Sequence, residues 1–288
     1  MSDSSGLFRT RWRRYLRRGL LALGIALVVM AGVLMVRATR LTSRQPEIGS
    51  VSEIHLRADT DLATHLAGAL RFATVSGSGG PVDPRAFLDL QGYLQDTFPR
   101  VHQQLRREVI GSYSLLYTWA GEDPALPAIV LLAHLDVVPA EVTAATAWTH
   151  PPFAGAIADG FVWGRGALDD KIAAISVLEA AEHLLTSGWK PRRTIILAFG
   201  HDEEVGGRQG AAKMAAVLEG RGVRAEMILD EGLAVTQGIL EGIDRPVALV
   251  GVAEKGFADV VMTAQTTGGH SSMPPATTAV GVLARALA

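Results

Sequence analysis

The sequence contains no cysteine, which excludes disulfide bridges and any metal site with thiolate ligands. A bound metal would have to be held by histidine, aspartate and glutamate side chains. The sequence also lacks an excess of positive charge, because its formal net charge is −2 at pH 7. This balance argues against a protein that binds nucleic acid through attraction to phosphates. The sequence shows no internal repeat and no low-complexity segment.

One segment lacks charge altogether. Residues 19–36 carry no ionisable side chain, and their length is close to what a helix needs to cross a bilayer. Residues 8–18 contain six arginines and no acid, and only three arginines follow, within residues 37–44. This asymmetry predicts a membrane anchor with a cytoplasmic N-terminus, which leaves the remaining chain in the periplasm or outside the cell. The alternative is a cleaved signal peptide and a secreted protein, and we favour the anchor.

The 288 residues, of which 48% are hydrophobic, suffice for one large domain or two ordinary ones. Residues 37–56 are polar and indicate a linker. Beyond them, hydrophobic patterns of helical and strand type alternate. We expect helices at 57–75, 84–98, 169–187 and 209–220, and strand segments at 108–119, 127–133, 161–164, 194–199 and 225–229.

The runs at 127–133, 194–199 and 225–229 have the composition of buried parallel strands. The alternation predicts an α/β fold over residues 57–245, with a mostly parallel sheet flanked by helices. Residues 246–265 have strand character with no helix between, so we expect a second, smaller domain to begin near residue 246.

Ionisable side chains follow the apolar strands in series. They are His134 and Asp136, Asp169 and Asp170, Glu203 and Glu204, and Asp230 and Glu231. In open α/β sheets, ligands bind at the carboxyl ends of the strands, so we expect these groups to gather. Gathered carboxylates repel one another, and two divalent metal ions would offset that repulsion. Histidine and carboxylate ligands suit zinc, although cobalt or manganese remains an alternative.

Each of these groups has an ordinary interpretation when it is taken alone. An acidic pair is usually a solvated surface, and an aspartate at a helix start is usually an N-cap. The series of four favours a metal site. In such a site one glutamate of the pair can bind metal while the other takes a proton from water. His134 can bind metal through one ring nitrogen while a nearby carboxylate, Asp136, orients the ring.

Five ordered motifs resemble one enzyme family. They are AHLDVVP at 133–139, PPFAG followed by DGFVWGRGALDDK within 151–171, GHDEEVGG at 200–207, LDEG at 229–232 and GGHSSMPP at 268–275. Together they are similar to the zinc exopeptidases that include aminoacylase, carboxypeptidase S and bacterial glutamate carboxypeptidases, with carboxypeptidase S as the nearest branch. The resemblance runs from about residue 50 to the end. It implies that residues 57–245 are the first part of a di-zinc catalytic domain and that residues 246–288 begin an α+β lid or dimerisation domain.

The resemblance also implies roles for the site residues. His134 resembles a ligand of one zinc with Asp136 as its orienting carboxylate, and Asp169 resembles the carboxylate that bridges both zinc ions. Glu203 resembles the general base and Glu204 a ligand of the second zinc. The next ligand is Asp230 or Glu231, and we favour Asp230. His270 resembles the histidine that reaches the site of a partner subunit in a homodimer and stabilises the developing oxyanion.

The implied reaction is the hydrolysis of an amide bond by a water that two zinc ions activate and Glu203 deprotonates. The implied substrate is a short peptide or an N-acyl amino acid with a free carboxylate. The runner-up activity within the enzyme class is removal of an acyl group from a biosynthetic intermediate, which the N-terminal anchor disfavours because such intermediates are cytoplasmic.

The chain departs from the family in its length. In the family the catalytic domain resumes after the lid and supplies a further histidine ligand and an arginine for the substrate carboxylate. We therefore expect the 288-residue chain to have weak activity or none, and the alternative is a membrane-anchored remnant of the fold. We interpret His150 as a loop residue near the site rather than as a substitute ligand.

Overall fold

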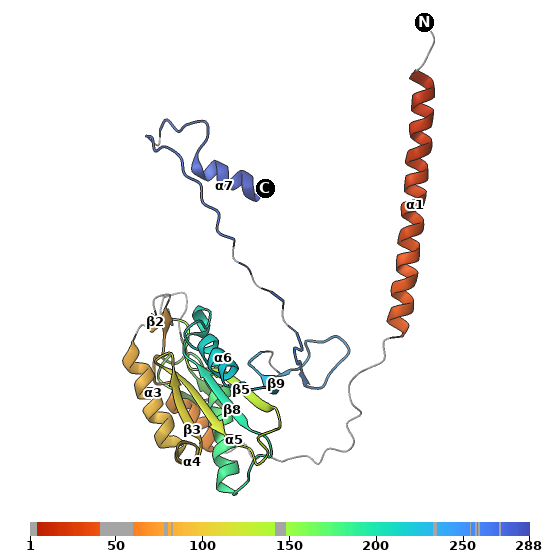
Figure 1. Cartoon of the computed structure of the whole chain (residues 1–288). Coiled ribbons are helices and arrows are strands. Elements are labelled where there is room, and N and C mark those ends of the chain that lie inside the picture. Colours follow the sequence, from red (N-terminus) through yellow and green to blue (C-terminus); the bar gives the residue numbers. More distant parts are fainter. Residues whose placement is uncertain are drawn as a thin grey trace. The chain divides into compact units, whose positions relative to one another are not determined.

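The computed structural model consists of two separate compact units, Met1–Arg57 and Ala58–Ala288 (Figure 1). It describes residues 5–40, 60–77, 80–81, 83–141, 148–232, 235–253, 255–256, 258, 260–270 and 272–288.

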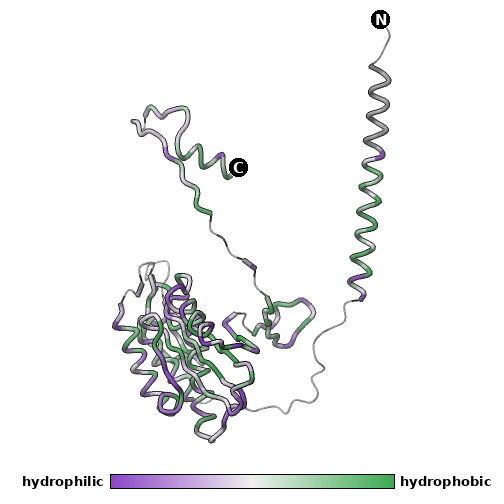
Figure 2. The backbone as a smooth tube through the Cα atoms, in the orientation of Figure 1, coloured by the Kyte–Doolittle hydropathy of each residue, from purple (hydrophilic) through white to green (hydrophobic). Residues whose placement is uncertain are grey.

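The described part of the first unit is one helix, α1 (Ser5–Thr39). Its segment Arg18–Thr39 has a mean hydropathy of 2.7 and buries none of its side chains. Figure 2 shows this stretch as a nearly continuous hydrophobic run. A helix of 22 residues is about 33 Å long, which matches the hydrocarbon core of a bilayer. By length and composition, α1 can therefore cross a membrane, and the predicted apolar segment 19–36 lies within it.

The centre of the second unit is a five-stranded sheet in the order β3-β4-β8-β5-β9. The strands are β3 (Arg106–Ile110), β4 (Ser114–Trp119), β5 (Ala128–His134), β8 (Ile195–Gly200) and β9 (Ala225–Leu229). β5 pairs in parallel with β8 and with β9, whereas β4 is antiparallel to both β3 and β8.

The sheet is thus mixed, and the expectation of a mostly parallel sheet was wrong for its β3–β4 side. The segment 108–119 forms parts of two strands because the chain reverses at Gly111 and Ser112, whose φ angles are 61° and 85°. A connection this short can join only antiparallel neighbours.

The helices cover both faces of this sheet. Alternate residues of β4 and β8 point to opposite faces, so Tyr117 and Phe199 belong to one buried cluster and Leu116 and Ala198 to the other. The first cluster lies under α2 (Thr60–Ala69), α3 (Pro84–Thr97), α4 (Pro99–Gln104) and α5 (Lys171–Thr186). The second lies under α6 (Ala211–Gly220). The core sits in these two layers and leaves the strand ends free to carry polar groups.

Most predicted helices are present, with shifted ends. The segments 84–98, 169–187 and 209–220 correspond to α3, α5 and α6, whereas 57–75 proved too long because α2 ends at Ala69. Beyond Ala69, main-chain and hydroxyl groups of residues 74–76 bond to neighbouring loops instead of continuing the helix. The short α4 was not predicted from the sequence, although Pro99 occupies its first position, where proline is favoured.

The prediction that 225–229 is a buried strand was wrong. β9 is a strand, but all five of its residues are exposed, with Met227 at 48% and Ile228 at 60%. The strand lies at the edge of the sheet with β5 as its one neighbour. The described residues do not cover its side chains. An edge strand and a central strand can have the same apolar composition, so composition did not distinguish them.

The strand character predicted for 246–265 was also mostly wrong. In the part that the structure describes, this region contains one two-residue strand, β11 (Val247–Ala248), which pairs with β10 (Val235–Thr236). Its apolar residues find no further partner strand among the described residues, and a single strand is not stable alone. The helix α7 (Ala279–Leu287) follows, and the Thr278 hydroxyl caps it by accepting from Gly281 N–H at 3.1 Å. A lid domain therefore stays a prediction.

Shorter elements complete the second unit. The pairs β1 (Ser76–Gly77) with β2 (Gly80–Pro81) and β6 (Ala156–Ala158) with β7 (Phe161–Trp163) are antiparallel. The predicted strand 161–164 corresponds to β7. A 3₁₀ turn, η1 (Glu203–Val205), follows β8 and carries both predicted glutamates.

Candidate metal centre

The path of the chain gathers the polar groups at one edge of the sheet. From β5 the chain continues to β8 on one side of it and then to β9 on the other side. A strand whose neighbours are reached in opposite directions marks a switch point, where ligands bind beyond the carboxyl ends of the strands. His134 ends β5, and η1 begins shortly after β8. The fold therefore brings together residues that are far apart in the sequence.

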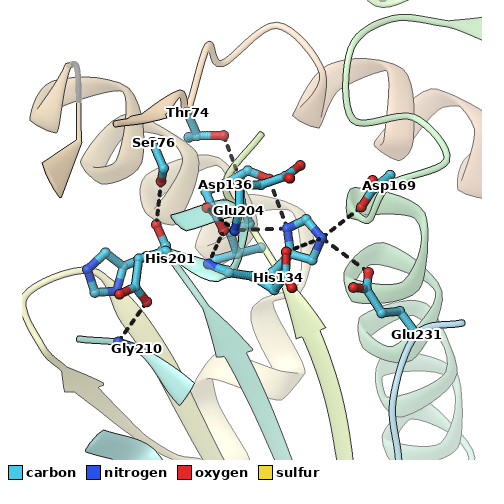
Figure 3. Close-up of polar contacts among 12 residues, drawn as sticks. Thr74, Ser76, His134, Asp136, Asp169, His201, Glu204, Gly210 and Glu231 are labelled. Carbon is cyan, nitrogen blue, oxygen red and sulfur yellow. Dashed lines mark hydrogen bonds and ion pairs between the residues drawn. The ribbon is translucent and has the colours of Figure 1, made fainter. Parts of the chain in front are cut away.

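His134 is the centre of this cluster, and its side chain is 2% exposed. Its Nδ1 lies 3.0 Å from the main-chain oxygen of Asp136 and 3.4 Å from Oδ1 of the same residue. Its Nε2 lies 2.9 Å from Asp169 Oδ1 and 3.1 Å from Glu231 Oε2 (Figure 3). One ring nitrogen is therefore held by Asp136, and the other faces acidic groups from two further segments.

Asp136 holds more than the imidazole. Its side chain is fully buried, and its two carboxylate oxygens accept hydrogen bonds from the N–H groups of Glu203 at 3.1 Å and Glu204 at 3.2 Å. Burial by itself raises the pKa of Asp136, but hydrogen bonds from His134 and Ser76 outweigh burial and lower that pKa below its ordinary value. An ionised Asp136 thus fixes both the ring of His134 and the turn η1.

Two sets of possible ligands share His134. One set adds Asp169 and Glu204, and the other adds Asp170 and Glu231. Within each set the potential ligand atoms lie within 4.8 Å of one another. One nitrogen and several carboxylate oxygens in this arrangement match the ligand chemistry of zinc.

The electrostatics of the cluster favour a bound cation. Burial, together with neighbouring charges, raises the pKa of Asp170 to about 7 and raises the pKa values of Glu203, Glu204 and Glu231. Burial lowers the pKa of His134, but Asp136, Glu231 and Asp169 outweigh it and raise that pKa to about 10. The carboxylates therefore repel one another and stabilise positive charge at their centre, which is the condition that a divalent ion relieves.

Asp170 gives a direct test of whether a metal fits. It is 3% exposed, and its Oδ2 is buried without a hydrogen-bond partner among the described residues. It stands at the N-cap position of α5, but its side chain makes no capping bond. A buried carboxylate oxygen without a partner is costly unless something positive binds it. The residues at this edge of the sheet thus fit a metal ion.

The structure brings together most of the residues singled out from the sequence. His134, Asp136, Asp169, Glu203 and Glu204 lie in the cluster. Glu203 belongs to neither ligand set, and its Oε2 lies 3.9 Å from His134 Nε2 with half of the side chain exposed.

Of the two acids after β9, Glu231 faces His134, whereas Asp230 Oδ1 accepts a hydrogen bond from Glu231 N–H at 2.9 Å. The sequence pattern did not single out Asp170 as a ligand. The sequence shows that Asp170 belongs to an acidic pair, but it does not show that the side chain is buried.

His150 and His270, which the sequence brings into consideration for the site, both lie outside the two ligand sets. His270 is exposed, and its Nδ1 lies 2.8 Å from the Ser272 hydroxyl. His150 packs its ring 5.1 Å from that of Trp163, and its Nε2 is buried with no hydrogen-bond partner among the described residues.

Comparison with known proteins places the chain among peptidases. Residues 130–287, more than half of the chain, match peptidase family M20/M25/M40. The chain is 42% identical over 265 residues to probable carboxypeptidase S-like 2 of Dictyostelium discoideum, covering 88% of this chain and 51% of that protein. It is 40% identical over 286 residues to the N-fatty-acyl-amino acid synthase/hydrolase PM20D1 of Xenopus tropicalis, covering 96% and 55%.

Carboxypeptidase S of Saccharomyces cerevisiae is 40% identical over 231 residues, which cover 75% of this chain and 39% of that protein. The chain thus spans about half the length of the curated relatives it matches.

Proposed function

The chain belongs to peptidase family M20/M25/M40, and from this membership we propose a metal-dependent hydrolase that cleaves the amide bond of short peptides or N-acyl amino acids. The observation that carries the proposal is His134 Nε2, which faces Asp169 at 2.9 Å and Glu231 at 3.1 Å at the carboxyl ends of the strands. The names of the relatives, carboxypeptidase S and N-fatty-acyl-amino acid synthase/hydrolase, support both substrate classes. Both classes carry a free carboxylate beside the scissile amide.

We propose that two zinc ions are held here, with Asp169 shared between them. One imidazole nitrogen binds one cation, so the two ligand sets that contain His134 cannot both use its Nε2. The first ion would use His134, Asp169 and the acid after β9, and the second would use Asp169 and Glu204. The separation of 3.1 Å between Glu231 Oε2 and His134 Nε2 favours Glu231 over Asp230 as the acid of the first ion. Bound zinc would lower the pKa of a water molecule and polarise the substrate carbonyl group.

Glu203 is proposed as the general base. Its carboxylate is outside both ligand sets and half exposed, so it can face a substrate and a water molecule. Burial raises the pKa of Glu203, which strengthens it as a proton acceptor relative to an ordinary glutamate. Its Oε2 would take the proton from water and return it to the leaving amine. Asp136 supports this role because it holds the N–H of Glu203.

His270 and α1 have roles in the same proposal. His270 is exposed and lies outside the cluster of its own chain, which is compatible with action at the site of a partner subunit. We propose that α1 anchors the enzyme with its catalytic unit outside the cytoplasm, or that α1 is part of a cleaved signal peptide. The alternative to an active enzyme is a remnant that keeps the metal but hydrolyses nothing.

Metal content and turnover together test the proposal. The full chain, purified in detergent, is analysed for zinc and assayed with N-lauroyl-phenylalanine and glycyl-leucine. We expect Glu203→Gln to retain zinc and to lose any hydrolysis, and Glu204→Gln to lose zinc as well. Glu219→Gln, an exposed acid on α6, is the control and should match the unchanged chain. A chain that binds no zinc would refute the proposal, whereas zinc without any turnover would identify the remnant.

A further inference from the structure

The residues that follow α2 form hydrogen bonds with loops of the candidate metal centre. We name residues 72–76 the brace, because they bond to loops that carry the site residues. Thr74 Oγ1 donates to the main-chain oxygen of Leu135 at 2.6 Å. Val137 N–H donates to Thr74 O at 3.0 Å, and Ser76 N–H donates to Val137 O at 3.2 Å. The brace thus clamps the loop after β5, on which Asp136 lies.

The same segment holds the loop after β8. The Ser76 hydroxyl donates to the main-chain oxygen of His201 at 2.9 Å and also lies against the Asp136 carboxylate. Figure 3 shows Thr74 and Ser76 side by side next to Asp136 and His201. His201 precedes η1 by two positions in the sequence. The brace therefore connects the loops that carry Asp136 and Glu204.

Lys171 attaches the third loop to the brace. It is the first residue of α5 and follows Asp170 directly. Its side chain is only 1% exposed, and its Nζ donates to Ala69 O at 3.1 Å and to Phe72 O at 2.7 Å. Ala69 is the last residue of α2 and Phe72 is the first residue of the brace, so Nζ connects the start of α5 to both.

The turn before Lys171 also packs closely against its neighbours. Lys171 N–H donates to Gly166 O at 3.1 Å, which closes the turn that contains Asp169 and Asp170. Gly166 has a φ of 79°, and a Cβ atom there would lie 2.5 Å from Val137 Cγ1. This turn therefore lies directly against the loop after β5, with Lys171 fixing its other side.

Burial lowers the pKa of the Lys171 amino group to about 7, so charging it here is costly. In a core position an apolar side chain of similar shape usually stabilises a fold as well or better. The fold of α5 needs no lysine here, because helix starts are stable without a buried cation. The hydrogen-bond partners of Nζ are the main-chain oxygens of Ala69, at the end of α2, and of Phe72, in the brace. The contact therefore bears on the position of the turn that contains Asp169 and Asp170.

We propose that Lys171 is a positioning residue that holds Asp169 and Asp170 at binding distance from His134 by fastening them to the brace. This inference rests on the proposed function, because it assumes that these acids bind metal. The inference also predicts the direction in which zinc affinity changes when Lys171 is replaced. Loss of a positive charge near the site would by itself strengthen cation binding, since like charges repel. Loss of a positioning contact would weaken it, typically about 10-fold to 100-fold for residues that orient metal ligands.

The test uses the full chain with Lys171→Met, which removes the charge and keeps the shape of the stem. Lys190→Met, at an exposed loop lysine, is the control. Zinc affinity is measured by competition with a chromogenic chelator, and the melting temperature of the metal-free chain is measured in parallel. We expect Lys171→Met to weaken zinc binding about 10-fold or more with little change in melting temperature.

Thr74→Val, which removes the hydroxyl bond from the brace to Leu135, provides the second variant and should weaken zinc binding in the same direction. It decides the test if Lys171→Met does not fold. Zinc affinity that is unchanged or tighter in the folded variants would overturn the inference, even if their melting temperature falls. If the chain without any substitution does not bind zinc, this result would instead refute the proposed function.

Discussion

At the residue scale, the geometry of the candidate metal centre depends on which atom of each polar side chain contacts which neighbour. Asp136 uses both oxygens on the main chain of η1 and also holds Nδ1 of His134, so one buried carboxylate aligns the proposed ligand and the proposed base. Nε2 is then the free nitrogen, and it points at acids from the α5 and β9 loops. Because of these orientations, we expect replacement of Glu231 and replacement of Asp230 to change zinc affinity by different amounts.

Replacement of these two acids distinguishes them. Glu231→Gln should weaken zinc affinity about 10-fold or more, because it removes a charged oxygen that lies 3.1 Å from Nε2. Asp230→Asn should change the affinity by less than about 3-fold, since asparagine can still accept the bond from Glu231 N–H that Asp230 accepts. Zinc titration of both variants measures the difference. The reverse order of effects would return the ligand role to Asp230.

At the scale of elements, the central strand β5 separates a buried neighbour from an exposed one. Val130 of β5 pairs with Ile196 of β8 on one side and with Ile228 of β9 on the other. Ile196 is 1% exposed and packs under α6, whereas Ile228 is 60% exposed. Two isoleucines in the same register therefore bury very different areas.

Alanine at each of these positions should show this difference. Ile196→Ala should lower the free energy of unfolding by about 2–5 kcal/mol, because it leaves a cavity in a packed layer. Ile228→Ala should lower it by less than about 1 kcal/mol, since little apolar area leaves the interior. Urea denaturation of the metal-free chain measures both. Equal losses would mean that β9 is covered in solution.

A second prediction for elements concerns the attachment of α6 to β3. Glu108 accepts from Arg221 Nη2 at 2.6 Å and Nη1 at 2.9 Å, and from Arg106 at 3.2 Å. The hydrogen bonds from Arg221 lower the pKa of Glu108, so the pair stabilises the fold above the ordinary glutamate pKa and stops doing so as the pH falls below it.

Glu108→Gln should lower the free energy of unfolding at pH 7 by at most about 1 kcal/mol, because the pair is partly exposed. The difference from the unchanged chain should shrink as the pH falls from 7 to 3, because Glu108 takes up a proton as the pH passes its lowered pKa. Urea denaturation at both pH values, with Glu219→Gln as control, measures it. A difference that stays the same between pH 7 and pH 3 would contradict the ionic interpretation.

At the scale of the whole molecule, the chain separates into an apolar helix and a unit with its own core. The unit Ala58–Ala288 contains both buried clusters and every residue of the two ligand sets. The helix α1 contributes none of them. Metal binding and membrane attachment should therefore be separable properties of the protein.

Removal of the first unit tests this separation. A chain that begins at Ala58 should be released from membranes and should keep the zinc content of the full chain. The full chain should stay with membranes after alkaline carbonate washing, because α1 exposes a long apolar surface. Release of the full chain, with N-terminal sequencing to find a new end, would favour the cleaved signal peptide.

The sequence by itself determined the features that depend on local pattern and chain order. Apolar runs followed closely by His134 or by Glu203 and Glu204 identified strands and the groups beyond their ends, because a strand and the residues after it are neighbours in the chain. The same logic identified the helices α3, α5 and α6. It also identified the uncharged segment 19–36, which lies within α1.

Only the tertiary structure decided features that depend on burial and direction between distant segments. The burial of Asp170, the choice of Glu231 over Asp230 as the neighbour of Nε2, and the exposure of β9 arise from packing between elements. The contact of Lys171 with the end of α2 joins residues about 100 positions apart. A linear pattern records which residues are present and in what order, but burial and side-chain direction are set by the segments that pack against them.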